Sequence, residues 1–523
     1  MSHLVHDILF DRARATPDAP ALQYADKDGH QRRSYAELAE DVRAAARALL
    51  AHGLAPGERV AVYMEKRIEN VCAMLGAAAA GGVFVPVNPL LKAEQVRYIL
   101  ADCNVRILVT TAERYTGLRA VLADCPDLQA VYVVNGGDTG PAIGWHAALA
   151  QAPERHGPTR IDADMAAILY TSGSTGAPKG VVLSHRNLVA GAHSVASYLE
   201  IAASDRVLSV LPLSFDYGLS QLTTAFLRGA HVVLMNHLFA RDIPLAVARH
   251  GITVLAAVPP LWNQLARLPW EADCTLRILT NSGGAMPRQT TETLVAALPR
   301  ARLFLMYGLT EAFRSTYLAP EEVVRRPDSI GRAIPNAEIM VVRPDGTPCG
   351  ADEEGELVHR GALVALGYWN DPARSAERFR PAPGQHPALA LPELAVWSGD
   401  TVRRDADGFL YFVGRVDDMI KVSGYRISPT EIEEVLYASG MVVEAAAFGI
   451  DDAQLGQSIV AVVLAQEGVN AAALLKECQR RLPAYMVPAR IELAGASLPR
   501  NPNGKIDRSL LRRTLSQRDP SAP

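Results

Sequence analysis

From about residue 35 to residue 307, short apolar runs alternate with longer helix-like segments. Residues 35–52 illustrate the helical kind, because their apolar positions recur with helical spacing and their other face is polar. Strands that alternate with helices are typical of parallel sheets covered by helices. Strands are predicted at residues 60–63, 106–109, 165–170, 232–235, 252–255 and 303–306. The pattern therefore predicts an α/β domain.

The pattern changes twice beyond residue 307. Apolar runs at residues 339–342 and 356–359 flank the turn sequence Pro344-Asp345-Gly346, which predicts a β-rich subdomain. Past residue 415, a small α+β unit is predicted, with helices at residues 429–437 and 471–482 and strands at residues 442–448 and 459–464. We expect an N-terminal domain at 1–414, a hinge at 415–419 and a mobile C-terminal domain at 420–523.

Charge and composition exclude several classes of protein. A formal net charge of −4, with no run of Lys and Arg, gives no basic surface for nucleic acid. The six cysteines are far apart, without a C-x-x-C pair, which predicts reduced thiols. Residues 71–87 lack charge, but Gly81-Gly82 and Pro86 interrupt them and a spanning helix needs about 20 residues. The sequence predicts a cytoplasmic protein without a transmembrane segment.

Residues 170–180, Tyr-Thr-Ser-Gly-Ser-Thr-Gly-Ala-Pro-Lys-Gly, predict a phosphate-binding loop. Glycines let backbone N–H groups converge on an anion, hydroxyls add donors, and Lys179 adds positive charge. A P-loop needs a lysine that leads into a helix, whereas Gly180 and an apolar pair follow Lys179. Apolar segments on both sides disfavour a flexible linker. The expected phosphate ligands are Thr171, Ser172, Gly173, Ser174, Thr175, Gly176 and Lys179.

Six further motifs follow in order, at residues 211–218, 282–285, 306–311, 397–400, 414–421 and 501–505. With the loop, they resemble the adenylate-forming superfamily of acyl-CoA synthetases, luciferases and peptide-synthetase adenylation domains. The resemblance covers essentially the whole chain. More narrowly, residues 85–96, 211–224 and 306–328 resemble AMP-forming acyl-CoA ligases associated with exosortase systems of Gram-negative bacteria.

The resemblance implies the acyl-CoA synthetase fold and a two-step reaction. A carboxylate attacks the α-phosphate of ATP to give an acyl-adenylate and pyrophosphate, and a thiol then takes the acyl group. It implies ATP, Mg²⁺ and coenzyme A as cofactors, a small carboxylic acid as substrate and a monomer or homodimer. The alternatives are loading of a carrier protein's phosphopantetheine, a nucleotide-binding protein without turnover, and an oxidase of the luciferase type.

The resemblance also assigns the nucleotide site. Glu311 is expected to bind Mg²⁺, although a carboxylate at a helix start is a common structural feature. Tyr307 is expected to stack on adenine, with a buried core tyrosine as the alternative. Asp400 would accept bonds from the ribose hydroxyls, Arg415 would donate from the far side, and Thr310 would bond the α-phosphate. The backbone near adenine would be that of Ser282, Gly283, Gly284, Ala285 and Gly308.

The C-terminal domain is expected to supply different residues to each step. Lys505, which could otherwise be a surface lysine, is by resemblance the adenylation lysine. Asp417 would be the hinge whose rotation removes Lys505 and brings a second segment to the site. That thiol-binding segment comprises Ser423, Gly424, Tyr425 and Arg426.

The substrate pocket departs from the commonest acyl-CoA synthetase pattern. Phe215 stands where many members carry histidine, and the Phe215-Asp216 pair resembles amino-acid-activating domains. Asp216 could pair with a substrate ammonium, or Arg314 could pair with Asp216 and satisfy the pocket without an amine. Tyr217, Trp262 and Met306 are expected as apolar walls or as plain core.

Overall fold

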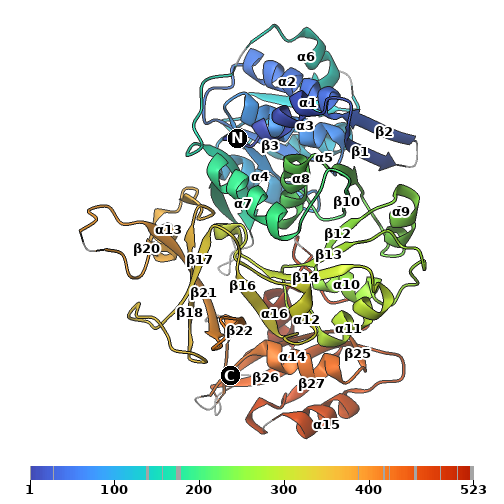
Figure 1. Cartoon of the computed structure of the whole chain (residues 1–523), viewed down its shortest axis with the longest axis vertical. Helices are drawn as coiled ribbons and strands as arrows, with labels where there is room; N and C mark the ends of the chain where they lie inside the picture. The colour runs from blue at the N-terminus through green and yellow to red at the C-terminus, as the bar shows by residue number, and fades with distance from the viewer. Residues whose placement is uncertain are drawn as a thin grey trace.

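The structure is a computed structural model. It describes residues 2–26, 29–136, 141–155, 157–171, 178–386, 388–415, 419–422, 425–452, 456–482, 484–502 and 504–518. Three sheets organise the chain. The N-terminal elements lie at one end of the molecule, the C-terminal elements lie at the other, and β17, β18 and β21 project to one side (Figure 1).

The first sheet has eight strands in the order β19-β9-β8-β4-β3-β5-β6-β7. Strands β8, β4, β3, β5, β6 and β7 pair in parallel, and β9 and β19 add antiparallel pairs at one edge. Its strands are β3 (Arg59–Tyr63), β4 (Val83–Pro86), β5 (Val105–Thr111), β6 (Ala130–Val134), β7 (Ile143–Gly144), β8 (Met165–Thr171), β9 (Lys179–Ser184) and β19 (Gly367–Tyr368). The helices along this part of the chain are α2 (Tyr35–Ala51), α3 (Ile68–Ala79), α4 (Ala93–Asp102), α5 (Ala112–Leu122) and α6 (Trp145–Gln151).

The second sheet has fourteen strands. Parallel pairs join β1, β11, β10, β12, β13 and β14, whereas β2 and the strands from β15 onward pair antiparallel. Its parallel strands are β1 (Pro20–Asp26), β10 (Arg206–Ser209), β11 (His231–Leu234), β12 (Val254–Ala257), β13 (Ile278–Asn281) and β14 (Arg302–Tyr307). The others are β2 (Gly29–Ser34), β15 (Thr316–Leu318), β16 (Ser329–Ala333), β17 (Ala337–Val342), β18 (Glu354–Gly361), β20 (Phe379–Pro381), β21 (Leu394–Arg404) and β22 (Leu410–Arg415).

The helices that accompany the second sheet include α8, which begins at the predicted pocket. Gly229 ends α8 in the left-handed region at φ 78°, a conformation that glycine adopts without strain. The set consists of α1 (Asp7–Ala15), α7 (His185–Tyr198), α8 (Asp216–Arg228), α9 (Asp242–His250), α10 (Pro259–Leu265), α11 (Arg288–Ala297), η1 (Thr310–Ala312), α12 (Pro320–Val323) and α13 (Pro372–Arg378).

The third sheet has five strands, in the order β24-β23-β26-β25 with β27 beside β26, and it has its own apolar core. Its elements are β23 (Ile420–Val422), β24 (Tyr425–Ile427), α14 (Pro429–Ala438), β25 (Val442–Asp452), β26 (Gly456–Ala465), α15 (Ala471–Arg481), η2 (Ala484–Met486), β27 (Arg490–Leu493) and α16 (Arg508–Arg518). The sheet thus starts close to the predicted boundary at residue 420, although the mobility of this part stays a prediction.

The expected fold class is confirmed, with one difference in how the sheets connect. The strands predicted beyond residue 307 do not form a separate sheet, because β15 pairs with β14 and β16 pairs with β22. Residues 71–87 form the end of α3, a turn at Gly81 and strand β4 rather than a spanning helix. Across the described residues, no helix is long and apolar enough to span a membrane. All six cysteines are free thiols, as expected.

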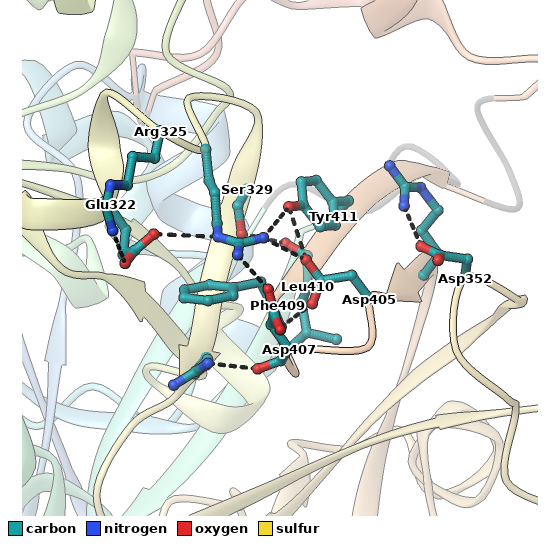
Figure 2. A network of polar contacts seen from close by, with 12 residues as sticks. Glu322, Arg325, Ser329, Asp352, Asp405, Asp407, Phe409, Leu410 and Tyr411 are labelled. Atoms are coloured by element: carbon teal, nitrogen blue, oxygen red, sulfur yellow. Dashed lines mark hydrogen bonds and ion pairs between the residues drawn. The ribbon is translucent and has the colours of Figure 1, made fainter.

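A polar network fixes the hairpin between β21 and β22, the two strands that carry Asp400 and Arg415. The Arg326 guanidinium donates to Asp405 at 2.8 Å and to Asp407 at 2.5 Å. Figure 2 shows Asp405, Asp407 and Tyr411 gathered around this guanidinium. The ring of Phe409 lies 4.2 Å from Arg326, so the cation also packs against an aromatic face. Because several charges act together, the network holds the hairpin more firmly than one exposed pair would.

His359 makes stability depend on pH. The ring lies in β18 with no exposed surface, Nδ1 is 2.9 Å from Ser315 Oγ, and burial lowers its pKa to about 4. Since the pKa in the unfolded chain is near 6.5, the unfolded state binds more protons between these pH values. The contribution of His359 is therefore fully present above pH 6.5 and is lost as the pH falls.

We expect His359→Asn to flatten the decline of unfolding free energy between pH 7 and pH 4, by about 3 kcal/mol at pH 4. Urea unfolding at a series of pH values measures the effect. The matched control is His386→Asn, since His386 is exposed and its replacement should leave the pH dependence unchanged. Parallel pH profiles for the wild type and His359→Asn would contradict the assignment.

Candidate active site

Lys179, Glu311 and Tyr368 form a cluster where three distant segments meet. Lys179 opens β9, Glu311 lies in η1 and Tyr368 ends β19. Lys179 Nζ is 3.0 Å from Glu311 Oε1, and the Tyr368 hydroxyl donates to the same oxygen at 2.5 Å. Burial alone would raise the pKa of Glu311, but Lys179 and Tyr368 outweigh it and lower the pKa to about 2. Glu311 is therefore a carboxylate at any physiological pH.

This cluster fits a Mg²⁺ ion that a nucleotide would carry. Mg²⁺ is usually held by one or two carboxylates together with phosphates and water, rather than by a cage of protein ligands. Within the described segments, no group of three or more His, Cys, Asp and Glu side chains could hold a metal ion. Glu311, only 8% exposed, supplies the single buried carboxylate that such a site needs.

Tyr307 and Asp400 form a second polar pair, at the ends of β14 and of the following sheet region. The Tyr307 hydroxyl donates to Asp400 Oδ2, and Arg415 Nε lies 3.5 Å from Asp400 Oδ1. Burial raises the pKa of Asp400, against the attraction of Arg415. Asp400 Oδ1 is buried and accepts no hydrogen bond from the described residues. A buried acceptor without a donor fits a ribose hydroxyl.

The segment at residues 282–285 approaches this region closely through its backbone. Gly283 has φ +88°, and a Cβ there would lie 3.2 Å from Lys505 Cε, so a larger residue would be strained and crowded. Asn281 Nδ2 donates to the Gly284 carbonyl at 3.2 Å, which fixes the turn. Gly308 is equally restricted, because a Cβ would lie 3.0 Å from Arg314 Cα.

The structure brings Lys505 into this site from the C-terminal part of the chain. The turn is closed by Lys505 N, which donates to Asn501 Oδ1 at 3.0 Å. Asn88 Nδ2, on the large domain, donates to the Pro502 carbonyl at 2.6 Å. Lys505 Nζ lies 5.9 Å from the centre of the Phe215 ring. Burial lowers the pKa of Lys505, whereas Asp216 and Asp400 raise it.

The predicted pocket residues surround the start of α8. Asp216 is buried and accepts from its neighbour's backbone N–H at 2.8 Å. Burial raises its pKa, while Arg314 and Lys505 lower it. No ion pair joins Asp216 to Arg314 in the described part of the chain; Arg314 instead donates to Ser282 Oγ at 2.6 Å. The direct pair considered from the sequence is therefore not formed.

Beyond Asp216 lies a cavity of about 30 Å³. Tyr217, Met306 and Arg314 contribute to its wall, as expected. Trp262 does not, because it is fully buried in the core and its Nε1 donates to the Thr280 carbonyl at 3.0 Å. Of the two interpretations of Trp262, the structure supports plain core.

Other predicted residues are placed only in part. Thr171, Thr310 and Ala285 are described, and Thr310 is buried at the start of η1. Tyr425 and Arg426 pair with β23 through their backbone, and their side chains are not described. Outside the described residues lie Ser172, Gly173, Ser174, Thr175, Gly176, Asp417, Ser423 and Gly424. Their roles stay predictions.

Three contributors to the site were not predicted. Tyr368 joins Lys179 to Glu311, Asn88 holds the turn of Lys505, and Asn281 holds the turn at Gly284. Tyr368 lies among apolar residues, so its sequence context resembles that of a core aromatic. Asn88 follows strand β4 closely, and a polar side chain after a strand end is the one signal that could have drawn attention to it.

Comparison with known families identifies the class of protein. The AMP-binding enzyme family matches residues 9–369, and the AMP-binding enzyme C-terminal domain matches residues 431–505. The chain belongs to the AMP-binding enzyme family, as its resemblance to the adenylate-forming superfamily predicted. The narrower resemblance to exosortase-associated ligases stays a prediction.

Curated relatives include both free-standing ligases and parts of larger synthases. Sulfoacetate–CoA ligase of Cupriavidus necator is 33% identical over 95% of each chain. L-proline–[L-prolyl-carrier protein] ligase of Pseudomonas fluorescens is 32% identical over 92% of this chain and 94% of its own. The chain spans only 14% of its relative in the plipastatin synthase of Bacillus subtilis, and 6% of its relative in the linear gramicidin synthase of Brevibacillus parabrevis.

Solved structures agree with the fold. ATP-bound MatB from Rhodopseudomonas palustris superposes with a TM-score of 0.87 at 27% identity, covering 98% of this chain and 99% of that one. The agreement extends across both the large domain and the C-terminal part.

Proposed function

We propose that the protein activates a carboxylic acid with MgATP to an acyl-adenylate and then transfers the acyl group to coenzyme A, releasing AMP. The observation that carries this proposal is the convergence of Lys505 with Asp216 and Gly283 on one side and with the Glu311 and Asp400 pairs on the other. A lysine from a separate sheet has no structural need to enter this site, whereas adenylation needs a cation there.

In the first step, the residues divide the substrate charges between them. Lys179 and the loop at 171–176 would bind the β- and γ-phosphates, and Thr310 would donate to the α-phosphate. Mg²⁺, held by Glu311, would supply positive charge to the phosphate oxygens. Lys505 would lie between the attacking carboxylate and the α-phosphate, and offset the negative charge that develops as the new bond forms.

In the second step, the C-terminal domain would turn about the hinge at 415–419, with Asp417 as the rotating residue. This rotation would withdraw Lys505 and bring Ser423, Gly424, Tyr425 and Arg426 toward the adenylate. Rotation of a domain about a few residues is a common way to serve two half-reactions with one site. Gly424 would leave room for the pantetheine arm.

Relatives support the reaction class and keep one alternative open. The similarity to sulfoacetate–CoA ligase over nearly the full length of both chains favours coenzyme A as the acceptor. The similarity to the L-proline carrier-protein ligase favours the alternative, in which phosphopantetheine on a carrier protein takes the acyl group. A cytoplasmic location and a monomeric or homodimeric state remain predictions.

We expect substrate-dependent pyrophosphate release with MgATP, and accumulation of an acyl-CoA when coenzyme A is added. The assay should include fatty, aryl and short carboxylic acids together with amino acids, each with and without coenzyme A. Selective turnover of an amino acid without any gain from coenzyme A would favour the carrier-protein alternative. Tight ATP binding without pyrophosphate release from any acid would contradict the proposal, and an O₂-dependent product would identify an oxidase.

A further inference from the structure

The acyl pocket holds a buried guanidinium whose charge is not paired within the described part of the chain. Arg314 is 2% exposed, and its guanidinium carbon lies 4.8 Å from the centre of the Tyr217 ring. Nη1 donates to Ser282 Oγ, whereas Nε is buried and has no hydrogen-bond partner among the described residues. Arg314 forms no ion pair with any of them. A buried cation is costly unless an anion or several acceptors satisfy it.

Asp216, by contrast, has favourable contacts without an added ammonium. It occupies the first position of α8, where the helix dipole favours a negative charge. It accepts from a backbone N–H, and Lys505 and Arg314 both add positive potential. An amino acid's ammonium placed beside Asp216 would lie in the field of those two cations. The pocket therefore has more need of an anion than of a cation.

Arg314 also borders the cavity beyond the reacting end, so its unpaired Nε faces a region that a substrate could reach. The Oγ1 atom of Thr224 is buried in the wall of the same cavity, without a partner among the described residues. It supplies a second hydrogen-bond donor. The cavity volume of about 30 Å³ equals roughly two water molecules, which limits the substrate to a short chain.

We propose that the substrate is a short carboxylic acid with a second anionic oxygen group, a carboxylate or a sulfonate, which Arg314 binds while Lys505 faces the reacting carboxylate. This inference rests on the proposed function. The second group would accept a hydrogen bond from Arg314 Nε and relieve the unpaired charge. Charged hydrogen bonds of this kind discriminate strongly, because a substrate without the group leaves the guanidinium buried and unpaired.

The test compares acids of matched length. Malonate, succinate, glutarate and sulfoacetate are assayed beside propionate, butyrate, valerate and aspartate for pyrophosphate release with MgATP and coenzyme A. We expect at least one of the first four to exceed its matched monoacid about 10- to 100-fold in kcat/KM, and Arg314→Met to reduce that ratio by a similar factor. Arg314→Lys, which keeps the charge, should retain part of the preference.

The control is Arg325→Met, because the Arg325 side chain is 78% exposed and its loss should leave the ratio unchanged. Isothermal titration with succinate and with sulfoacetate reads the Arg314 subsite without turnover. Activity with monoacids or aspartate above all four dianions would overturn this inference while leaving the proposed function intact. Binding of a dianion that Arg314→Met weakens, without pyrophosphate release, would support the subsite and contradict the proposed function. A preference that separates succinate from sulfoacetate identifies the anionic group.

Discussion

Lys505→Ala is expected to lower the rate of acyl-adenylate formation about 100- to 1,000-fold, because one cation that stabilises developing negative charge is lost. Lys505 is partly buried in this arrangement and its Cε packs near Gly283, so its ammonium is held toward the reacting atoms. Thioester formation from supplied acyl-adenylate should be spared. In that step, the domain rotation would already have removed the lysine from the site.

Two assays separate these half-reactions. Single-turnover pyrophosphate release measures adenylation, and acyl-CoA formation from chemically prepared acyl-adenylate measures thioester formation. Lys476→Ala is the matched control, since Lys476 lies exposed on α15 of the same domain and should affect neither step. Equal loss of both half-reactions in Lys505→Ala would refute the division of labour between two domain positions.

Local patterns predict most of the individual strands and helices, but not their pairing. Strand β12 begins two residues after the predicted run, and α14 and α15 lie within a residue of their predicted ranges. Strand β1, in contrast, pairs with β11 from about two hundred residues later. Such pairing depends on which surfaces meet in the folded chain, and hydrophobic periodicity holds no information about it.

The same limit separates the predicted site residues from those that were missed. Lys179 and Glu311 carry chemistry that is recognisable in the sequence, so both were predicted and the structure places them 3.0 Å apart. Tyr368 contributes only because β19 docks against β9, which brings its hydroxyl to both side chains. Arg314 shows the converse. The sequence suggested its partner as Asp216, whereas the fold directs it to Ser282.

The second large effect concerns Glu311. Glu311→Gln should lower adenylation about 100-fold and raise the Mg²⁺ concentration needed for half-maximal rate, because a neutral amide is a poor ligand for a hard cation. The variant also leaves Lys179 without its counter-charge. The assay is pyrophosphate release across a Mg²⁺ titration, and Glu321→Gln, exposed on α12, is the control. An unchanged Mg²⁺ dependence would contradict the metal role.

Stability measurements provide an independent check on the same residue. Because the pKa of Glu311 falls to about 2 in the folded protein, its contribution is present above its ordinary pKa near 4.5 and is lost as the pH falls toward 2. Glu311→Gln should therefore remove part of the acid destabilisation below pH 4.5, whereas Tyr368→Phe, which keeps the Lys179 pair, should remove less. A loss of Mg²⁺ affinity together with this change would assign both effects to one carboxylate.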